Sequence, residues 1–157
     1  MKCLLLLSFV LMGTSPSPGH RQRPLFLDPT GTYILKGTVE KNRIMGHSGE
    51  IRVKLLDPRK VAMSFYINKG YPGYESGAFT DTLLYDDCNQ AWYRPSKDPG
   101  CTIIFVFKDW NAEAMKLLDD PRTGCGFGNG VLEAAVFKKF SSEAPMIQDL
   151  SGHGVLP

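Results

Sequence analysis

Apolar and polar residues alternate with a period of two along most of the chain after residue 30, a pattern that indicates β-strands. In the segments 51–55 and 61–67, every second residue is large and apolar, so each strand has one buried face. The segment 112–118 also has a composition that suits a short helix. A strand is favoured there, because an isolated segment of that length cannot hold a helix without packing support. The pattern predicts eight strands, at 31–37, 51–55, 61–67, 79–85, 90–94, 101–107, 112–118 and 131–137.

The connections between these segments carry the residues that tight turns use. Asp, Asn, Pro and Gly recur there, for example in Asp57-Pro-Arg59 and Asp98-Pro-Gly100. Short strands joined by short turns predict an antiparallel meander. Eight strands of one meander can close into a barrel, which leaves no exposed edge. We therefore expect an all-β fold, a single antiparallel meander of about eight strands that forms a barrel or a barrel-like sheet.

The N-terminal residues have the pattern of a secretory signal peptide, predicted over 1–17. Lys2 precedes the apolar run 4–12, and small, turn-forming residues follow. That run is shorter than the roughly 20 residues needed to span a bilayer, so no membrane association is expected after cleavage. The rest of the chain is predicted as a flexible leader over 18–29, a β-barrel domain over 30–142 and a disordered tail over 143–157. The predicted location is periplasmic or secreted.

Three cysteines follow the predicted signal peptide, namely Cys88, Cys101 and Cys125. In an exported chain, two cysteines beside apolar strands are most simply read as a disulfide. Cys101 and Cys125 begin or precede strands at the same end of the meander, so we expect them to pair. Cys88 lies in a turn from which it would compete for Cys101 across a hairpin. With the favoured pairing, Cys88 remains a free or intermolecular thiol.

Several segments between Gly31 and Lys139 carry a resemblance, namely Gly31–Tyr33, Gly49–Val53, Asn68–Gly77, Phe79–Leu83, Asp98–Cys101 with Ile103 and Phe105, and Cys125–Val131. In these segments the chain resembles a family of small exported β-proteins of Bacteroidetes-type bacteria. A cysteine before a β-strand and a later Cys-Gly-Phe-Gly turn are also similar to the β-barrel domains of periplasmic lysozyme-inhibitor-like proteins. The chain departs from the first family at Asn129, where His is usual, at 133–135, where Ala-Asp-Gly is usual, and at Cys88, where Asn is more frequent.

Charge and candidate catalytic groups exclude several classes of function. The chain has 18 basic and 16 acidic residues, a formal net charge of +2, whereas nucleic-acid binding needs a concentrated positive surface. Of the three histidines, only His47 falls inside the predicted domain, in a hairpin turn. No spacing of His, Cys and carboxylate residues suggests a metal site. We expect no catalytic residue, no metal and no cofactor, and a hydrolase is the least favoured alternative.

Two acidic residues, Asp81 and Glu133, fall at strand positions that alternate with apolar residues. A buried carboxylate must be hydrogen-bonded or paired. Asp81 is therefore expected to bind backbone groups, or Arg and Tyr side chains, inside the barrel.

The best candidate for a binding surface is the loop 69–77, which is long for a hairpin connection. It contains Tyr71 and Tyr74, residues of the type enriched at binding hot spots, together with Glu75 and Ser76. The alternative is that this loop folds over one end of the barrel as a lid. The Cys125 turn is expected nearby, with Phe127 covering the end of the core and Asn129 beside it.

These observations predict an exported, non-enzymatic binding protein with a protein partner outside the cytoplasm. The resemblance to lysozyme-inhibitor-like domains implies a more specific function, the inhibition of a cell-wall-degrading enzyme. The alternative is a lipocalin-like carrier that holds a small apolar ligand inside the barrel. The oligomeric state is left open by the sequence.

Overall fold

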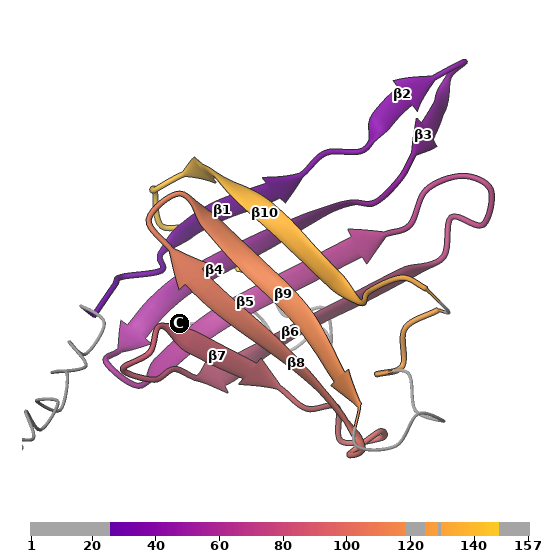
Figure 1. Cartoon of the computed structure of the whole chain (residues 1–157). Helices are drawn as coiled ribbons and strands as arrows, with labels where there is room; N and C mark the ends of the chain where they lie inside the picture. Colours follow the sequence, from indigo (N-terminus) through magenta and orange to yellow (C-terminus); the bar gives the residue numbers. More distant parts are fainter. Residues whose placement is uncertain (1–25, 119–124, 129, 148–157) are drawn as a thin grey trace, which may run out of the picture.

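The computed structural model describes residues 26–118, 125–128 and 130–147, and no helix occurs among them. The segment 112–118 is a strand, as predicted. Figure 1 shows an antiparallel barrel from which one small hairpin projects. The strands are β1 (Gly31–Leu35), β2 (Thr38–Glu40), β3 (Arg43–Met45), β4 (Ser48–Asp57), β5 (Lys60–Asn68), β6 (Ser76–Leu84), β7 (Gln90–Tyr93), β8 (Cys101–Lys108), β9 (Asn111–Leu118) and β10 (Ala134–Ser141).

Eight of these strands form one antiparallel sheet in the order β6-β5-β4-β1-β10-β9-β8-β7. Because β1 pairs with both β4 and β10, it joins the first and last parts of the meander. The two edges, β6 and β7, meet through a bridge between Tyr85 and Ala91. Beside it the rings of Phe79 and Tyr93 stack, with their centroids 3.7 Å apart. The sheet is thus a nearly closed barrel, which confirms the predicted fold class.

Aromatic side chains fill the interior of the barrel. Phe65 lies among four other rings, with centroid separations of 5.2 to 6.0 Å. Tyr33 and Phe107 meet edge to face at 5.7 Å. The other inward positions of β4, β5 and β8 are mostly Ile, Val and Met, as the alternation predicts. The residues around Phe65 are Phe79, Phe105, Phe127 and Phe137.

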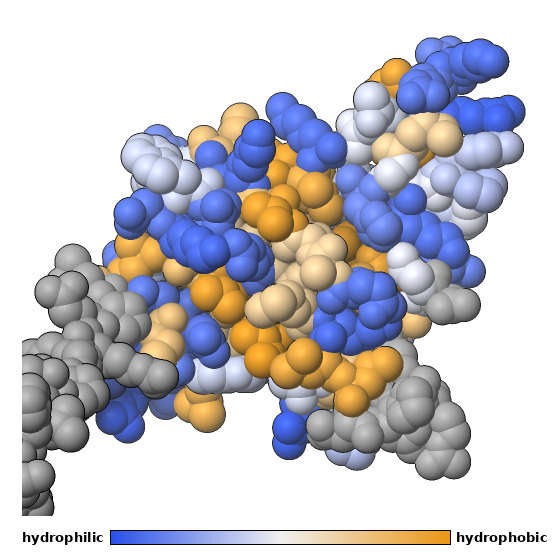
Figure 2. All heavy atoms as spheres, in the orientation of Figure 1, coloured by the Kyte–Doolittle hydropathy of each residue, from blue (hydrophilic) through white to orange (hydrophobic). Residues whose placement is uncertain are grey.

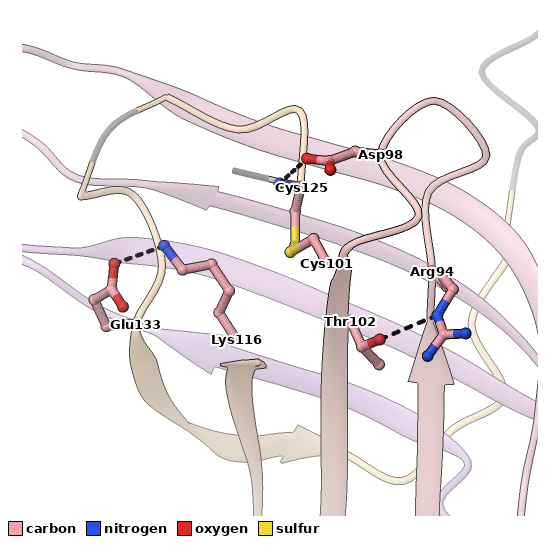
Figure 3. The surroundings of a disulfide bond; sticks show 7 residues. All are labelled: Arg94, Asp98, Cys101, Thr102, Lys116, Cys125 and Glu133. Carbon is pink, nitrogen blue, oxygen red and sulfur yellow. Dashed lines mark hydrogen bonds and ion pairs between the residues drawn. A yellow bond between two sulfur atoms is a disulfide. The ribbon is translucent and has the colours of Figure 1, made fainter. Parts of the chain in front are cut away.

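The predicted disulfide between Cys101 and Cys125 is present, with a Cα–Cα distance of 5.2 Å. It joins the start of β8 to the connection between β9 and β10 (Figure 3). The backbone N–H of Cys125 also donates to Asp98 Oδ2 at 2.7 Å, as drawn in the same figure. Cys88 is an exposed free thiol. A disulfide is compatible with an oxidising compartment outside the cytoplasm.

Two strand assignments from the sequence need correction. The segment 38–45 forms the short hairpin β2–β3, whereas the sequence indicated only a turn around His47. Its strands have three residues each, too few to show alternation, and Lys41 and Asn42 both have positive φ, as in a type I′ turn. The last strand is 134–141 instead of 131–137. Val131 and Leu132 are buried but precede it, so burial there comes from a connection and not from a strand.

Both ends of the described chain contact the barrel. The N–H of Leu27 donates to Asn89 Oδ1 at 2.9 Å, and its carbonyl accepts from the Tyr85 hydroxyl at 2.9 Å. Residues 143–147, the described part of the expected tail, lie over the outer face of the barrel. Met146 lines a groove there with Ser64, and Ile147 is 2% exposed.

Candidate functional site: the long-loop end of the barrel

The longer connections of the barrel gather at one end, which we call the long-loop end. The β2–β3 hairpin lies there between β1 and β4, and so do the loop 69–75 and the connections between β7 and β8 and between β9 and β10. The opposite end has the tight turns at 58–59 and 109–110. Figure 1 shows the hairpin and the β5–β6 loop projecting side by side from the barrel. Surface loops held by a rigid scaffold are where binding residues concentrate.

The loop 69–75 is held against the β2–β3 hairpin by backbone and side-chain contacts. The N–H of Tyr71 donates to the Ile44 carbonyl at 2.7 Å. The Arg43 guanidinium lies over the Tyr71 ring, 4.4 Å from its centroid. Gly70 has a φ of +73°, and a Cβ there would approach the Gly46 carbonyl to 2.4 Å, so glycine is required where the two segments meet. We call the combination of 38–45 and 69–75 the tip.

The Cys125 turn joins the same end from the other side. Phe127 stacks on Phe65, with ring centroids 6.0 Å apart, and also lies directly on Gly77 at the start of β6. Phe127 therefore covers the end of the core, in the place expected of it. Next to it, Gly128 packs against the Glu75 side chain so closely that a Cβ would meet it at 2.7 Å. The loop 69–75 and the Cys125 turn are thus adjacent.

The tip presents aromatic rings and positive charge to solvent. Tyr71 and Tyr74 are 39% and 45% exposed, and their rings meet edge to face with centroids 6.3 Å apart. Arg43 is exposed beside them, and Lys69 is paired with Glu75. Such rings offer apolar contact area together with hydroxyls that can form hydrogen bonds. Glu75 and Ser76 are also exposed at this end.

The structure changes the interpretation of the two strand carboxylates. Asp81 is exposed and not interior, and it lies on β6, an edge strand of the sheet. It accepts a hydrogen bond from the backbone N–H of the next residue, Thr82, at 2.7 Å, but at the surface and not inside the barrel. Glu133 lies just before β10, exposed, and pairs with Lys116 at 2.6 Å. Asn129, the remaining candidate, lies outside the described residues.

The described structure has little room for a ligand inside the barrel. The interior is occupied by the rings around Phe65, and the grooves of about 310 to 390 Å³ are lined largely by outward-facing residues. His47, expected in a solvated turn, is exposed, and its Nε2 lies 3.1 Å from the Gly130 carbonyl. Within the described ranges, no three His, Cys, Asp or Glu residues form a group that could hold a metal ion. Nor does that part of the chain contain a helix long and apolar enough to cross a membrane.

The fold and the site together define a disulfide-linked, nearly closed eight-stranded β-barrel with a filled core and, at one end, a tip that exposes two tyrosine rings beside an arginine. Comparison of the chain with protein-family models, with curated proteins and with solved structures finds no match. The function must therefore be argued from the site itself.

The contacts that hold the loop 69–75 against the β2–β3 hairpin could not be predicted from the sequence. The loop 69–75 was identifiable by its length and its two tyrosines. Its contact with Arg43 was not, because the hairpin carrying Arg43 was not predicted. The available indication of that hairpin was Asn42, which has the β-branched residues Thr38 and Val39 before it and Ile44 after it.

Proposed function

We propose that this chain is an exported, non-enzymatic binding protein that inhibits a cell-wall-degrading enzyme through its tip. The observation that carries the proposal is the presentation of Tyr71 and Tyr74. Both rings are substantially exposed, yet the backbone that carries them is held in place. The N–H of Tyr71 donates to the Ile44 carbonyl at 2.7 Å, and the N–H of Tyr74 donates to the Gly70 carbonyl at 2.8 Å. A loop already held in one conformation loses less entropy on binding, which favours affinity.

The exposed guanidinium of Arg43 suits the active site of a glycoside hydrolase. Most such enzymes place two carboxyl groups on either side of the bond they cleave, so their clefts are acidic. Arg43 on the hairpin, beside the Tyr71 ring, offers a guanidinium that can bind a carboxylate through two hydrogen bonds. A narrow projection with a cation and two phenol rings at its end fits such a cleft. The filled interior favours this function over carriage of an apolar ligand.

The resemblance to lysozyme-inhibitor-like barrels supports the same proposal from the sequence. It rests on the Cys-Gly-Phe-Gly turn and the cysteine before β8. In this structure that turn lies against the loop 69–75. The residues that carry the resemblance and the residues that form the tip therefore belong to one end of the barrel.

The test is a cell-wall lysis assay with a panel of purified lysozymes and other glycoside hydrolases, titrated with the chain. The proposal expects inhibition of at least one enzyme. Replacing both rings, Tyr71→Ala with Tyr74→Ala, should weaken that inhibition by about 100-fold or more, as expected for two hot-spot residues. Tyr66→Ala is the matched control, since Tyr66 is 45% exposed but lies on the outer face of β5, and it should inhibit like the wild type.

Two results would count against the proposal. If the chain inhibits none of the enzymes, the function is wrong. If it inhibits one and the double tyrosine variant inhibits equally well, the contact surface lies elsewhere. A pull-down from secreted or periplasmic fractions with the same variants then identifies which protein, if any, the tip retains.

A further inference from the structure

Tyr74 has a backbone conformation that its own side chain disfavours. Its φ is +51°, in the left-handed region where a bulky residue is an outlier. The other non-glycine residues with positive φ in the described part of the chain have local explanations. Lys41 and Asn42 form the turn of the β2–β3 hairpin, where this conformation is usual. Asn89 is of a residue type that tolerates it, and Cys125 is held by its disulfide.

The Tyr74 side chain contributes little to the fold. It is 45% exposed, its ring meets that of Tyr71 on the same loop, and it is not among the residues that pack against the core. Figure 2 shows the projecting hairpin, at the upper right, standing clear of the barrel, and the loop 69–75 lies against it. A glycine would adopt this φ without cost. A residue that strains the backbone and adds little to the core fits a role in binding, because strained conformations cluster at such sites.

Asn68, the last residue of β5, holds Tyr74 in this conformation. Its Nδ2 donates to the Tyr74 carbonyl at 2.8 Å, and its Oδ1 accepts from the Gly70 N–H at 2.7 Å. The N–H of Tyr74 in turn donates to the Gly70 carbonyl at 2.8 Å. Tyr74 is therefore bonded on both sides of its Cα, and the bonds lead back to a strand that pairs with both β4 and β6.

We propose that Asn68 is a positioning residue, which holds the strained Tyr74 so that its ring is fixed at the surface for contact with a partner. The binding part of this inference rests on the proposed function. Because the N–H and the carbonyl of Tyr74 are both bonded within the loop, the phenol ring is what this residue offers to a partner. When a loop loses its order before binding, the apparent affinity falls with the fraction of molecules that keep the binding conformation.

The strain at residue 74 is tested in the free chain. Tyr74→Gly and Tyr74→Ala both lose the ring, but only the alanine variant keeps a Cβ in the left-handed conformation. In urea unfolding, the folding equilibrium constant of the glycine variant should exceed that of the alanine variant about threefold or more. It should also be no lower than that of the wild type. A glycine variant less stable than either protein would overturn the inference.

The role of Asn68 is tested by the nuclear Overhauser effect between the N–H and the Hα of Tyr74, which is strongest when φ is positive. Asn68→Ala should weaken this signal. Asn68→Asp should weaken it too, since it keeps the acceptor for Gly70 but loses the donor to the Tyr74 carbonyl. Asp57→Ala is the matched control and should leave the signal unchanged, because Asp57 Oδ1 accepts from the Arg59 N–H, also two residues on, at the opposite end of the barrel. If neither Asn68 variant changes the signal, Asn68 does not position Tyr74.

The consequence for binding is measured on an enzyme that the chain inhibits. Asn68→Ala keeps both rings but lowers the fraction of chains with the Tyr74 ring in place. It should slow association about tenfold and change dissociation less than about twofold. Tyr74→Ala removes a contact and should instead speed dissociation about tenfold or more. Equal association rates for Asn68→Ala and the wild type would overturn the binding role.

Failure of this inference is distinguishable from failure of the proposed function. If the chain inhibits no enzyme, the proposed function is wrong and the binding role falls with it. The two experiments on the free chain still decide whether residue 74 is strained and whether Asn68 holds it. If an enzyme is inhibited but the free-chain results are negative, the proposed function stands and this inference is wrong.

Discussion

The contact between Gly77 and Phe127 gives a sharp test of how the long-loop end is built. A Cβ on Gly77 would lie 2.2 to 2.4 Å from three atoms of the Phe127 ring. Since Gly77 occupies a regular strand position in β6, the reason for glycine there is space for the ring. Gly77→Ala must therefore displace Phe127 from the end of the core.

Two opposing terms set the size of this effect. Loss of the half-buried Phe127 ring from the core costs about 2 kcal/mol. Alanine is better than glycine inside a strand by roughly 0.5 to 1 kcal/mol. In the wild type, Gly77→Ala should lower the free energy of unfolding by about 1 to 1.5 kcal/mol, the difference between these terms. In a Phe127→Ala background the ring is already absent, so the same substitution should stabilise the barrel by about 0.5 kcal/mol or more.

The assay is a double-mutant cycle by urea unfolding of the four proteins, with equal m-values required for comparison. The expected result is a change of sign between the two backgrounds and a coupling of about 2 kcal/mol. An equal cost of Gly77→Ala in both backgrounds would refute the reasoning, because the ring would then not be what excludes a side chain at residue 77.

Three further predictions concern the stability of the barrel. Reducing the disulfide, which joins residues 24 apart, should lower the free energy of urea unfolding by about 3.5 kcal/mol, while Cys88→Ser should leave it unchanged. Burial raises the pKa of Tyr33 and of Tyr85. As the pH rises, these tyrosines therefore lose their protons first in the unfolded chain, and the free energy of unfolding should fall above about pH 10. Each tyrosine lowers it by up to about 1.4 kcal/mol for each pH unit. Tyr33→Phe should reduce that slope by up to about 1.4 kcal/mol per pH unit, its own contribution, in unfolding experiments from about pH 9 to 11.5. Ile147→Ala should cost about 2 kcal/mol or more by urea unfolding, and Met146→Ala, at a residue 67% exposed, almost nothing.

The strands that alternate along their whole length were predictable because burial of one face alone determines where their apolar residues lie. In β5 and β8 each inward residue is apolar and buried, and in β4 Ile51 and Val53 are, so pattern and burial coincide. The disulfide was predictable for a related reason, since Cys101 begins a strand and Cys125 precedes one at the same end of an antiparallel meander. The start of β10 was not predictable from apolar content, because Val131 and Leu132 are buried by tertiary contacts before the strand begins.

The site was predictable only in part, because its geometry depends on contacts between distant segments. Length and composition identified the loop 69–75, but its position depends on Arg43 and Ile44 in a hairpin too short to recognise. Asp81 was misplaced for a similar reason. Alternation with Phe79 implies an inward position, but alternation cannot show which strands are edges, and Asp81 lies on the edge strand β6.

The disulfide and the tip are connected through a short series of contacts, so stability and binding should not be separable at this end. The bond to Cys101 fixes the position of Cys125, whose N–H is also held by Asp98. The same turn places Phe127 on Gly77, at the first residues of β6. The loop 69–75 ends there, and its other side rests on the hairpin. Each contact in this series restricts the conformations open to the tyrosine-bearing loop. Although the disulfide lies far from the tip in sequence, it therefore restricts the geometry on which the proposed binding depends.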